Sequence, residues 1–202
     1  MKTQIKKSLL PILFFCTFFA AHSQEAKTNE LTLGYGVITT SSSLDFFKNF
    51  FLLPAFTGGS HRAENYIYSG ASYISYSHTL KDNFSIGAEL VYERISKDIF
   101  TSSTKDGRQI DNNLTIAAHA KYSYIVNPKF RMYSGLGAGY TTTQAKFTPV
   151  ENSLYKASKG NRGSFNFHVT ALGFRFGKKA AVSAELGFGY KGIANIGFSY
   201  QL

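Results

Sequence analysis

Cysteine is almost absent from this 202-residue chain, and the single one, Cys16, lies close to the N-terminus. Beyond it the sequence cannot form a disulfide framework and has no thiolate for metal binding or nucleophilic catalysis. His61, His78 and His119 are scattered and lack the spacing of metal ligands. We therefore expect neither a metal nor another cofactor.

The chain also lacks an apolar run of the roughly 20 residues that a membrane-spanning helix needs. Its longest run, residues 9–21, follows three lysines and ends at small residues, which is the pattern of a secretory signal peptide. We expect residues 1–23 to be a cleaved signal peptide, 24–28 a short N-terminal segment and 29–202 the folded domain. Lipidation at Cys16 is the alternative.

Proline is scarce as well, and the three prolines after the signal segment are Pro54, Pro128 and Pro149. All three fall between segments in which apolar and polar residues alternate. Proline cannot donate a hydrogen bond to a sheet, so its restriction to the connections favours β-strands between them.

Alternation with a period of two is what the sequence does have, and it recurs in eight segments. In residues 84–94, Ile86 and Leu90 share one face, whereas Glu89 and Glu93 share the other. Each segment is at least as long as the roughly 9–11 residues with which a tilted strand crosses a bilayer. The segments lie at about residues 29–38, 66–80, 84–94, 112–126, 129–141, 164–176, 180–190 and 193–202.

Two segments depart from simple alternation. In residues 164–176 the apolar parity changes between Ala171 and Leu172, which predicts a β-bulge there. Residues 66–80 carry tyrosines on both parities, so the sequence does not decide which side of this strand faces the interior.

The connections alternate between tight turns and long polar segments. Tight turns are expected at 81–83, 127–129 and 177–179, and long connections at 39–65, 96–111 and 142–163. Short turns at one rim and long loops at the other are typical of outer-membrane barrels. A sheet in lipid must close on itself to pair its edges, so we predict an all-β, eight-stranded antiparallel up-and-down transmembrane barrel. Eight strands leave an interior that side chains fill, rather than an open porin channel.

A secreted lipocalin-like barrel is the rival, because it shows the same alternation with apolar side chains inside. Aromatic residues near the predicted strand ends favour the membrane, where they form interfacial girdles. These residues are Phe84, Tyr92, Tyr124, Phe130, Tyr140 and Tyr190.

The last eight residues resemble the C-terminal signal that barrel-assembly machinery recognises, through Asn195, Gly197, Tyr200 and the final Leu202. With the preceding AELGFGYKG, residues 28–202 resemble the small outer-membrane barrels of the OmpX, OmpW and OmpA-transmembrane-domain kind. The resemblance implies insertion into the outer membrane by that machinery, and no particular activity.

Six charged residues fall on the polar parity, where pairing is expected because an isolated buried charge is costly. They are Glu89, Glu93, Lys121, Arg131, Arg175 and Glu185. We interpret them as a static network of ion pairs that holds the shape of the barrel. The alternative is a gate that exchanges pairs and passes small ions.

One arrangement suggests an enzyme: His168 and Thr170 on one strand, with Glu185 on the next, resemble the layout of outer-membrane lipid A deacylases. A hydroxyl activated by a histidine, itself oriented by a carboxylate, is a plausible nucleophile. We rank a lipid A-modifying hydrolase third among the possible functions.

The first long connection is unusually apolar, and its aromatic residues fit one side of a short helix. This helix would lie on the membrane surface, fold over the barrel mouth as a lid, or admit a hydrophobic ligand. The residues concerned are Phe46, Phe47, Phe50, Phe51 and Leu53.

Positive charge is in excess, with a formal net charge of +10. Lys146, Lys156, Lys159 and Arg162 suggest contact with phosphates of outer-membrane lipid and lipopolysaccharide, whereas export argues against nucleic acid. We expect a monomeric protein with a structural or surface-interaction role. A carrier or channel for small hydrophobic molecules is the alternative.

Overall fold

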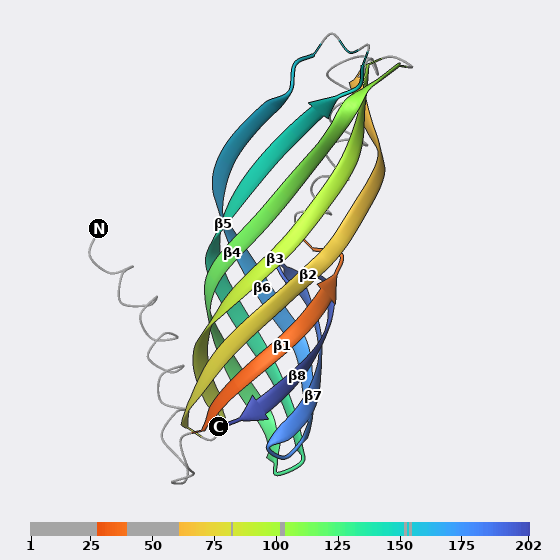
Figure 1. Cartoon of the computed structure of the whole chain (residues 1–202). Coiled ribbons are helices and arrows are strands. Elements are labelled where there is room, and N and C mark those ends of the chain that lie inside the picture. The colour runs from red at the N-terminus through yellow and green to blue at the C-terminus, as the bar shows by residue number, and fades with distance from the viewer. Residues whose placement is uncertain (1–27, 40–60, 82, 102–103, 152, 154) are drawn as a thin grey trace, which may run out of the picture.

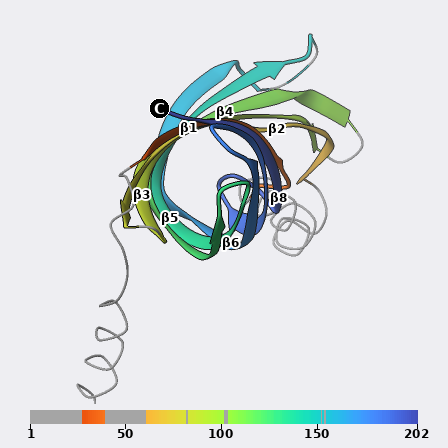
Figure 2. The same ribbon diagram turned by 90° about the horizontal axis from the view of Figure 1, so that it is seen from below.

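The computed structural model describes residues 28–39, 61–81, 83–101, 104–151, 153 and 155–202. Its strands are β1 (Asn29–Val37), β2 (His61–Lys81), β3 (Phe84–Thr101), β4 (Thr104–Asn127), β5 (Phe130–Pro149), β6 (Ser158–Gly177), β7 (Ala180–Gly189) and β8 (Ala194–Gln201). Each strand pairs with its neighbour in the chain, and β1 pairs antiparallel with β8, which closes the ring (Figure 2). The predicted eight-stranded antiparallel barrel is confirmed.

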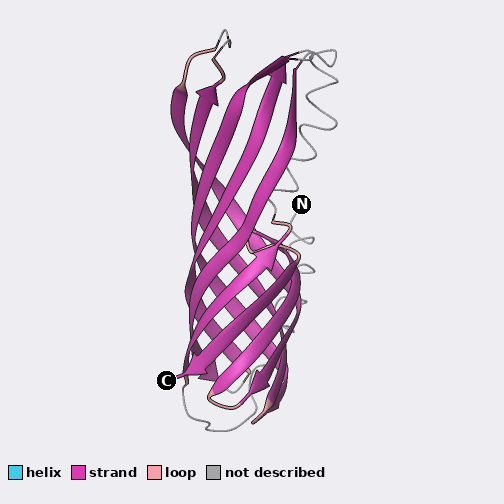
Figure 3. Cartoon of the chain, turned by 45° about the vertical axis from the view of Figure 1, so that its right-hand side comes forward, coloured by secondary structure: helices cyan, strands magenta, loops and turns pink. Residues whose placement is uncertain are grey.

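The two ends of the barrel differ. The turns after β2, β4 and β6 lie at one end, together with the C-terminus (Figure 1); we call this the turn end. At the other end, β2 to β6 rise well beyond β1, β7 and β8 (Figure 3), and we call this part the extension. Within the described ranges, no helix has the length and apolar character to cross a membrane.

The extension corrects the sequence-based prediction for the residues at that end, which were expected to form long polar loops. Strands β3 and β4 stay paired as far as Thr101 and Thr104, with one register shift between Ile99 and Phe100, and β5 and β6 stay paired as far as Phe147 and Ser158. Backbone hydrogen bonds continue the ladder there, and ion pairs of the buried Asp98 and Asp111 support it, so this part needs no apolar face. Residues 40–60 of the first connection, with the predicted aromatic helix or lid, lie outside the described residues, and so do residues 1–27.

Both irregular strands contain bulges. The pairing of β6 with β7 shifts register between Thr170 and Leu172, so the predicted bulge is confirmed. Phe165 and Phe176 consequently both face outward although their parities differ. In β2 the register shifts next to Gly70, whose φ of +70° suits glycine.

The tyrosines of β2 lie on both faces of the barrel. Tyr73 points inward and is buried, whereas Tyr76 is exposed on the outer surface. The tyrosines that the sequence showed on both parities therefore serve both faces of the barrel.

Polarity is distributed as a membrane requires. Outward-facing side chains between the turn end and the extension are mainly apolar, and those more than half exposed include Leu33, Ile116, Leu136, Ile196 and Phe198. Buried side chains are mainly polar and include Thr32, Ser75, Thr115, Ser183 and Ser199. A lipocalin has the opposite arrangement, so this barrel spans the outer membrane, with the apolar belt against lipid.

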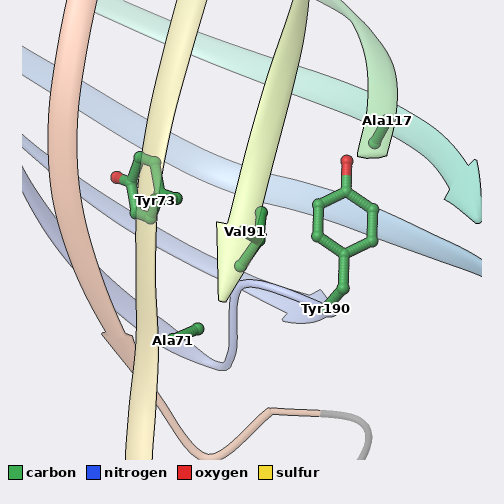
Figure 4. Packing of buried hydrophobic residues seen from close by; sticks show 5 residues of the cluster. All are labelled: Ala71, Tyr73, Val91, Ala117 and Tyr190. Atoms are coloured by element: carbon green, nitrogen blue, oxygen red, sulfur yellow. The ribbon is translucent and has the colours of Figure 1, made fainter. Parts of the chain in front are cut away.

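The aromatic girdle is confirmed in part. Tyr92, Tyr124 and Tyr140 are exposed on the outer surface, as interfacial residues should be. Tyr190 is a correction, because β7 ends at Gly189 and Tyr190 turns inward, where it is buried. Figure 4 shows Tyr190 in the small apolar cluster of the interior, with Ala71, Tyr73, Val91 and Ala117.

Candidate functional site in the charged interior

Two acidic residues form the centre of the interior, Glu89 from β3 and Glu185 from β7. Both occupy inward positions of their strands and are buried. Buried carboxylates are stable only when cations and hydrogen-bond donors surround them, so their partners define the site.

Glu185 has three donors. The Nζ of Lys191 lies 3.0 Å from its Oε2, and the Nζ of Lys121 lies 3.2 Å from its Oε1. The hydroxyl of Tyr133 donates to Oε1 at 2.8 Å. Charge-assisted contacts of this kind are the strong ones in a protein interior, so they fix the Glu185 carboxylate.

Glu89 shares one of these cations, because the Nζ of Lys191 lies 3.3 Å from its Oε2. The hydroxyl of Tyr190 donates to Oε1 of Glu89, and the Nδ1 of His119 lies 3.7 Å from Oε2. Lys191 therefore joins the two carboxylates. Two carboxylates and the two ammonium groups of Lys121 and Lys191 balance in charge.

Lys191 reaches this place because the β7–β8 connection folds into the barrel rather than away from it. Gly189 and Gly192 flank the connection with φ of +142° and +103°, conformations that side-chain-bearing residues rarely adopt. A Cβ at Gly36 would overlap the carbonyl of Lys191, and one at Gly137 would overlap the Tyr190 hydroxyl. These glycines make room for the inward turn.

The three other predicted interior charges lie elsewhere. Glu93 accepts hydrogen bonds from Thr39 and, at 3.3 Å, from the amide of Asn113. Arg175 lies near the turn end, where its Nε is 2.7 Å from Glu30 Oε2. Arg131 also faces the interior at the turn end. The structure thus brings together Glu89, Glu185 and Lys121 of the six predicted residues.

The deacylase-like residues do not assemble into a relay. His168 is 2% exposed, and neither of its ring nitrogens has a hydrogen-bond partner among the described residues. Thr170 is buried in the interior as well. Glu185 uses both carboxylate oxygens on the lysines and Tyr133, so it does not orient the imidazole.

The extension carries a second cluster of charges, around Asp98. The guanidinium of Arg108 lies 2.9 Å from Oδ1, the ammonium of Lys105 lies 2.8 Å from Oδ2, and Asn65 donates to Oδ2 at 3.1 Å. The hydrogen bond from Arg108 is the main reason why the pKa of Asp98 is held well below its usual range. This cluster fastens the outer part of the β3–β4 hairpin.

The C-terminal residues form β8 and close the barrel. Asn195 is buried inside, Gly197 packs near Tyr73, and Tyr200 is exposed on the outer surface. The backbone N–H of Leu202 donates to the carbonyl of Asn29 at 2.9 Å. Recognition of these residues by assembly machinery stays a prediction.

Lys146 and Lys159 are directly opposite each other on β5 and β6 and are exposed on the outer face of the extension. Arg162 lies across the sheet, with its Nη2 3.6 Å from Oδ2 of Asp111. The lysine-rich third connection of the sequence is therefore split between the two faces. Among the described residues, no three His, Cys, Asp or Glu side chains are grouped as metal ligands.

Comparison with known proteins gives similarities of shape alone, since no family model and no curated protein matches the sequence. Ail, the attachment invasion locus protein of Yersinia pestis, in complex with the heparin analogue sucrose octasulfate, is 11% identical over 88% of this chain and 96% of its own, with a TM-score of 0.44. The N-terminal β-barrel domain of Pseudomonas aeruginosa OprF is 12% identical over 89% of this chain and all of its own, with a TM-score of 0.42. A structure of Ail alone is 12% identical over 88% and 96%, with a TM-score of 0.42.

Proposed function

We propose that this protein is a non-catalytic surface-interaction protein of the outer membrane, in which a filled barrel holds a rigid β-sheet outside the cell. The observation that carries the proposal is the extension. Strands β2 to β6 continue their ladder beyond the apolar belt, whereas β1, β7 and β8 stop within it.

The extension has an open edge along β6. Among the described residues, β6 pairs with β7 only from His168 to Gly177, so residues 158–166 pair with β5 alone. Every residue from Ser158 to Phe165 is exposed. A row of unpaired backbone donors and acceptors accepts an extended segment of another protein as an added strand. We infer that strand addition at this edge is the mode of interaction.

The interior supports a static role. Lys191, Tyr190 and Tyr73 occupy the lumen, and Lys191 ties Glu89 to Glu185. Side chains in these positions disfavour an open porin channel. Removing any one of the charges would leave its partner buried without compensation, which favours a static network of ion pairs. The buried residues around the lumen are mainly polar, which gives no support to a carrier for hydrophobic molecules.

We also propose that the outer leaflet binds the extension through Lys146 and Lys159. Like charges directly opposite in a sheet repel each other, and an anionic group between them removes the repulsion. The pair lies six residues beyond the Tyr140–Phe165 contact at the edge of the belt, which is about 15 Å along the normal for a strand tilted by about 40°. That height suits the phosphorylated sugars of lipopolysaccharide. A monomer and insertion by the assembly machinery remain expectations.

Strand addition is tested with the full chain in lipid nanodiscs and a fluorescent ten-residue peptide of alternating threonine and valine. We expect the peptide to bind, and a version N-methylated at every second residue not to bind. Replacing residues 144–161 by an Asn-Gly turn between the paired Thr143 and Arg162 should weaken binding, because it removes residues 158–161 of the open edge. Replacing 97–109 between Ser96 and Ile110 is the matched control, because it shortens a hairpin away from the β6 edge. Equal binding by the N-methylated peptide would overturn the proposal.

A further inference from the structure

Two arginines of the interior face each other at the turn end. Arg131 of β5 and Arg175 of β6 are direct partners in the register, and both line the same interior cavity. The Cα atoms of such partners are about 4.5–5.5 Å apart. Two like charges in these positions are unfavourable unless negative charge compensates both of them.

The nearby acids compensate only one of the two arginines. The Oε2 of Glu30 lies 2.7 Å from the Nε of Arg175, and it also accepts a hydrogen bond from the side-chain amide of Gln201 at 3.4 Å. Two more of the five N–H donors of Arg175 go to the carbonyls of Gly177 and Lys178, at 3.1 and 2.8 Å, which leaves donors of its guanidinium for another acceptor.

No acid is left for Arg131. Glu185 is taken by Lys121 and Lys191. In the part of the chain that the structure describes, Arg131 has no carboxylate within ion-pair distance. The turn end of the interior therefore carries one surplus positive charge.

The cavity between these groups has a volume of about 30 Å³. Its charged lining is Lys121, Arg131, Arg175 and Glu30, and hydroxyl side chains such as Ser85 and Ser123 complete it. Guanidinium and ammonium groups only donate hydrogen bonds, and hydroxyls can donate too, so the lining is rich in donors. About 10–15 Å³ measured in this way holds one water, so the space suits two waters or one small ion.

We propose that this cavity binds one small inorganic anion of about the size of chloride, held between Arg131 and Arg175. The surplus charge, the excess of donors and the small volume each favour such an anion. The site is independent of the extension, and it would make the stability of the barrel depend on the anion in the medium. Binding to the folded form alone raises the free energy of unfolding as anion is added.

Diffraction gives the direct test. Crystals of the full chain grown in sodium bromide should show one anomalous peak between the guanidinium groups of Arg131 and Arg175. A cavity without that peak contradicts the proposal, because water then fills the space. This measurement needs no variant and so does not depend on the folding of a mutant.

Solution measurements give the second test. The midpoint of thermal unfolding of the full chain in detergent should rise with sodium chloride and saturate, relative to sodium gluconate at equal ionic strength. The rise should vanish in Arg131→Gln and persist in Arg131→Lys, which keeps the charge. Lys129→Gln, an exposed neighbour on the β4–β5 turn, is the matched control and should respond as the parent does. Equal midpoints in chloride and gluconate would overturn the assignment.

Discussion

At the scale of single residues, the interior depends on Lys191. Sequence parity predicts that Glu89, Glu185 and Lys121 face inward, because alternation fixes which side chains of a strand do so; in the structure Glu89 and Glu185 are buried and Lys121 contacts Glu185. It missed Lys191 and Tyr190, since they follow the end of β7 and the rule of alternation stops there. The glycines on either side of them, at positions that require positive φ, were the only available sign of an inward turn.

Replacing Lys191 by methionine should destabilise the barrel strongly. The substitution leaves Glu89 and Glu185 buried with one cation fewer, and breaking a buried ion pair on one side costs about 3–5 kcal/mol. Urea unfolding followed by tyrosine fluorescence in detergent measures the change. Lys178→Met, at an exposed turn position, is the control and should have no effect. The double variant Lys191→Met/Glu185→Gln should recover part of the loss, and the absence of any recovery would argue against direct pairing.

At the scale of elements, the number of strands, their antiparallel order and the β6 bulge were predictable. Apolar side chains against lipid impose a strict period of two, and a bulge is visible as a change of parity at Leu172. The extension was not predictable in the same way, because a sheet surrounded by water needs no apolar face. Residues 96–111 therefore read as polar loop although most of them pair in β3 and β4.

The outer part of the β3–β4 hairpin should be stable at neutral pH and weaken only in strong acid. The pKa of Asp98 is lowered in the folded state, mainly by Arg108, so its stabilising effect is complete above the unfolded value of about 3.9. The effect is lost as the pH falls through the lower, folded value. NMR amide signals of Lys97 and Arg108 in detergent, followed from pH 6 to pH 1, should report this loss. In Asp98→Asn the amide signals of Lys97 and Arg108 should no longer change with pH in this range. If the variant shows the same acid transition as the parent, another group causes that transition.

At the scale of the whole molecule, the barrel combines an apolar belt, a polar interior and the extension, which we propose lies outside the cell. The position in the membrane follows from the inverted polarity seen in the exposed Leu136 and Ile196 and in the buried Ser75 and Ser199. The binding partners of the extension cannot be predicted from the sequence. An open backbone edge such as that of β6 offers the same hydrogen-bond donors and acceptors whatever its side chains are.

Lipopolysaccharide should co-purify less well with the variant Lys146→Gln/Lys159→Gln. Each basic residue near an anionic membrane surface contributes about 1 kcal/mol, so losing two weakens binding by about 30-fold. Phosphate analysis of the purified protein in nanodiscs containing lipopolysaccharide measures the bound glycolipid. The matched control is Lys178→Gln/Lys179→Gln at the turn end, which should keep its lipopolysaccharide. Equal retention by all three proteins would show that the outer lysine pair is not a binding site.

Single cysteines test the central claim most directly, because the only native cysteine lies in the expected signal peptide. Gly160 in the extension has no atom within 4 Å of a Cβ placed there, and Lys178 is exposed at the turn end, so both positions tolerate cysteine. In intact cells a membrane-impermeable maleimide should label Gly160→Cys, and it should reach Lys178→Cys only after the outer membrane is permeabilised. Labelling of both positions in intact cells, or of Lys178→Cys alone, would contradict a barrel that spans the outer membrane with its extension outside.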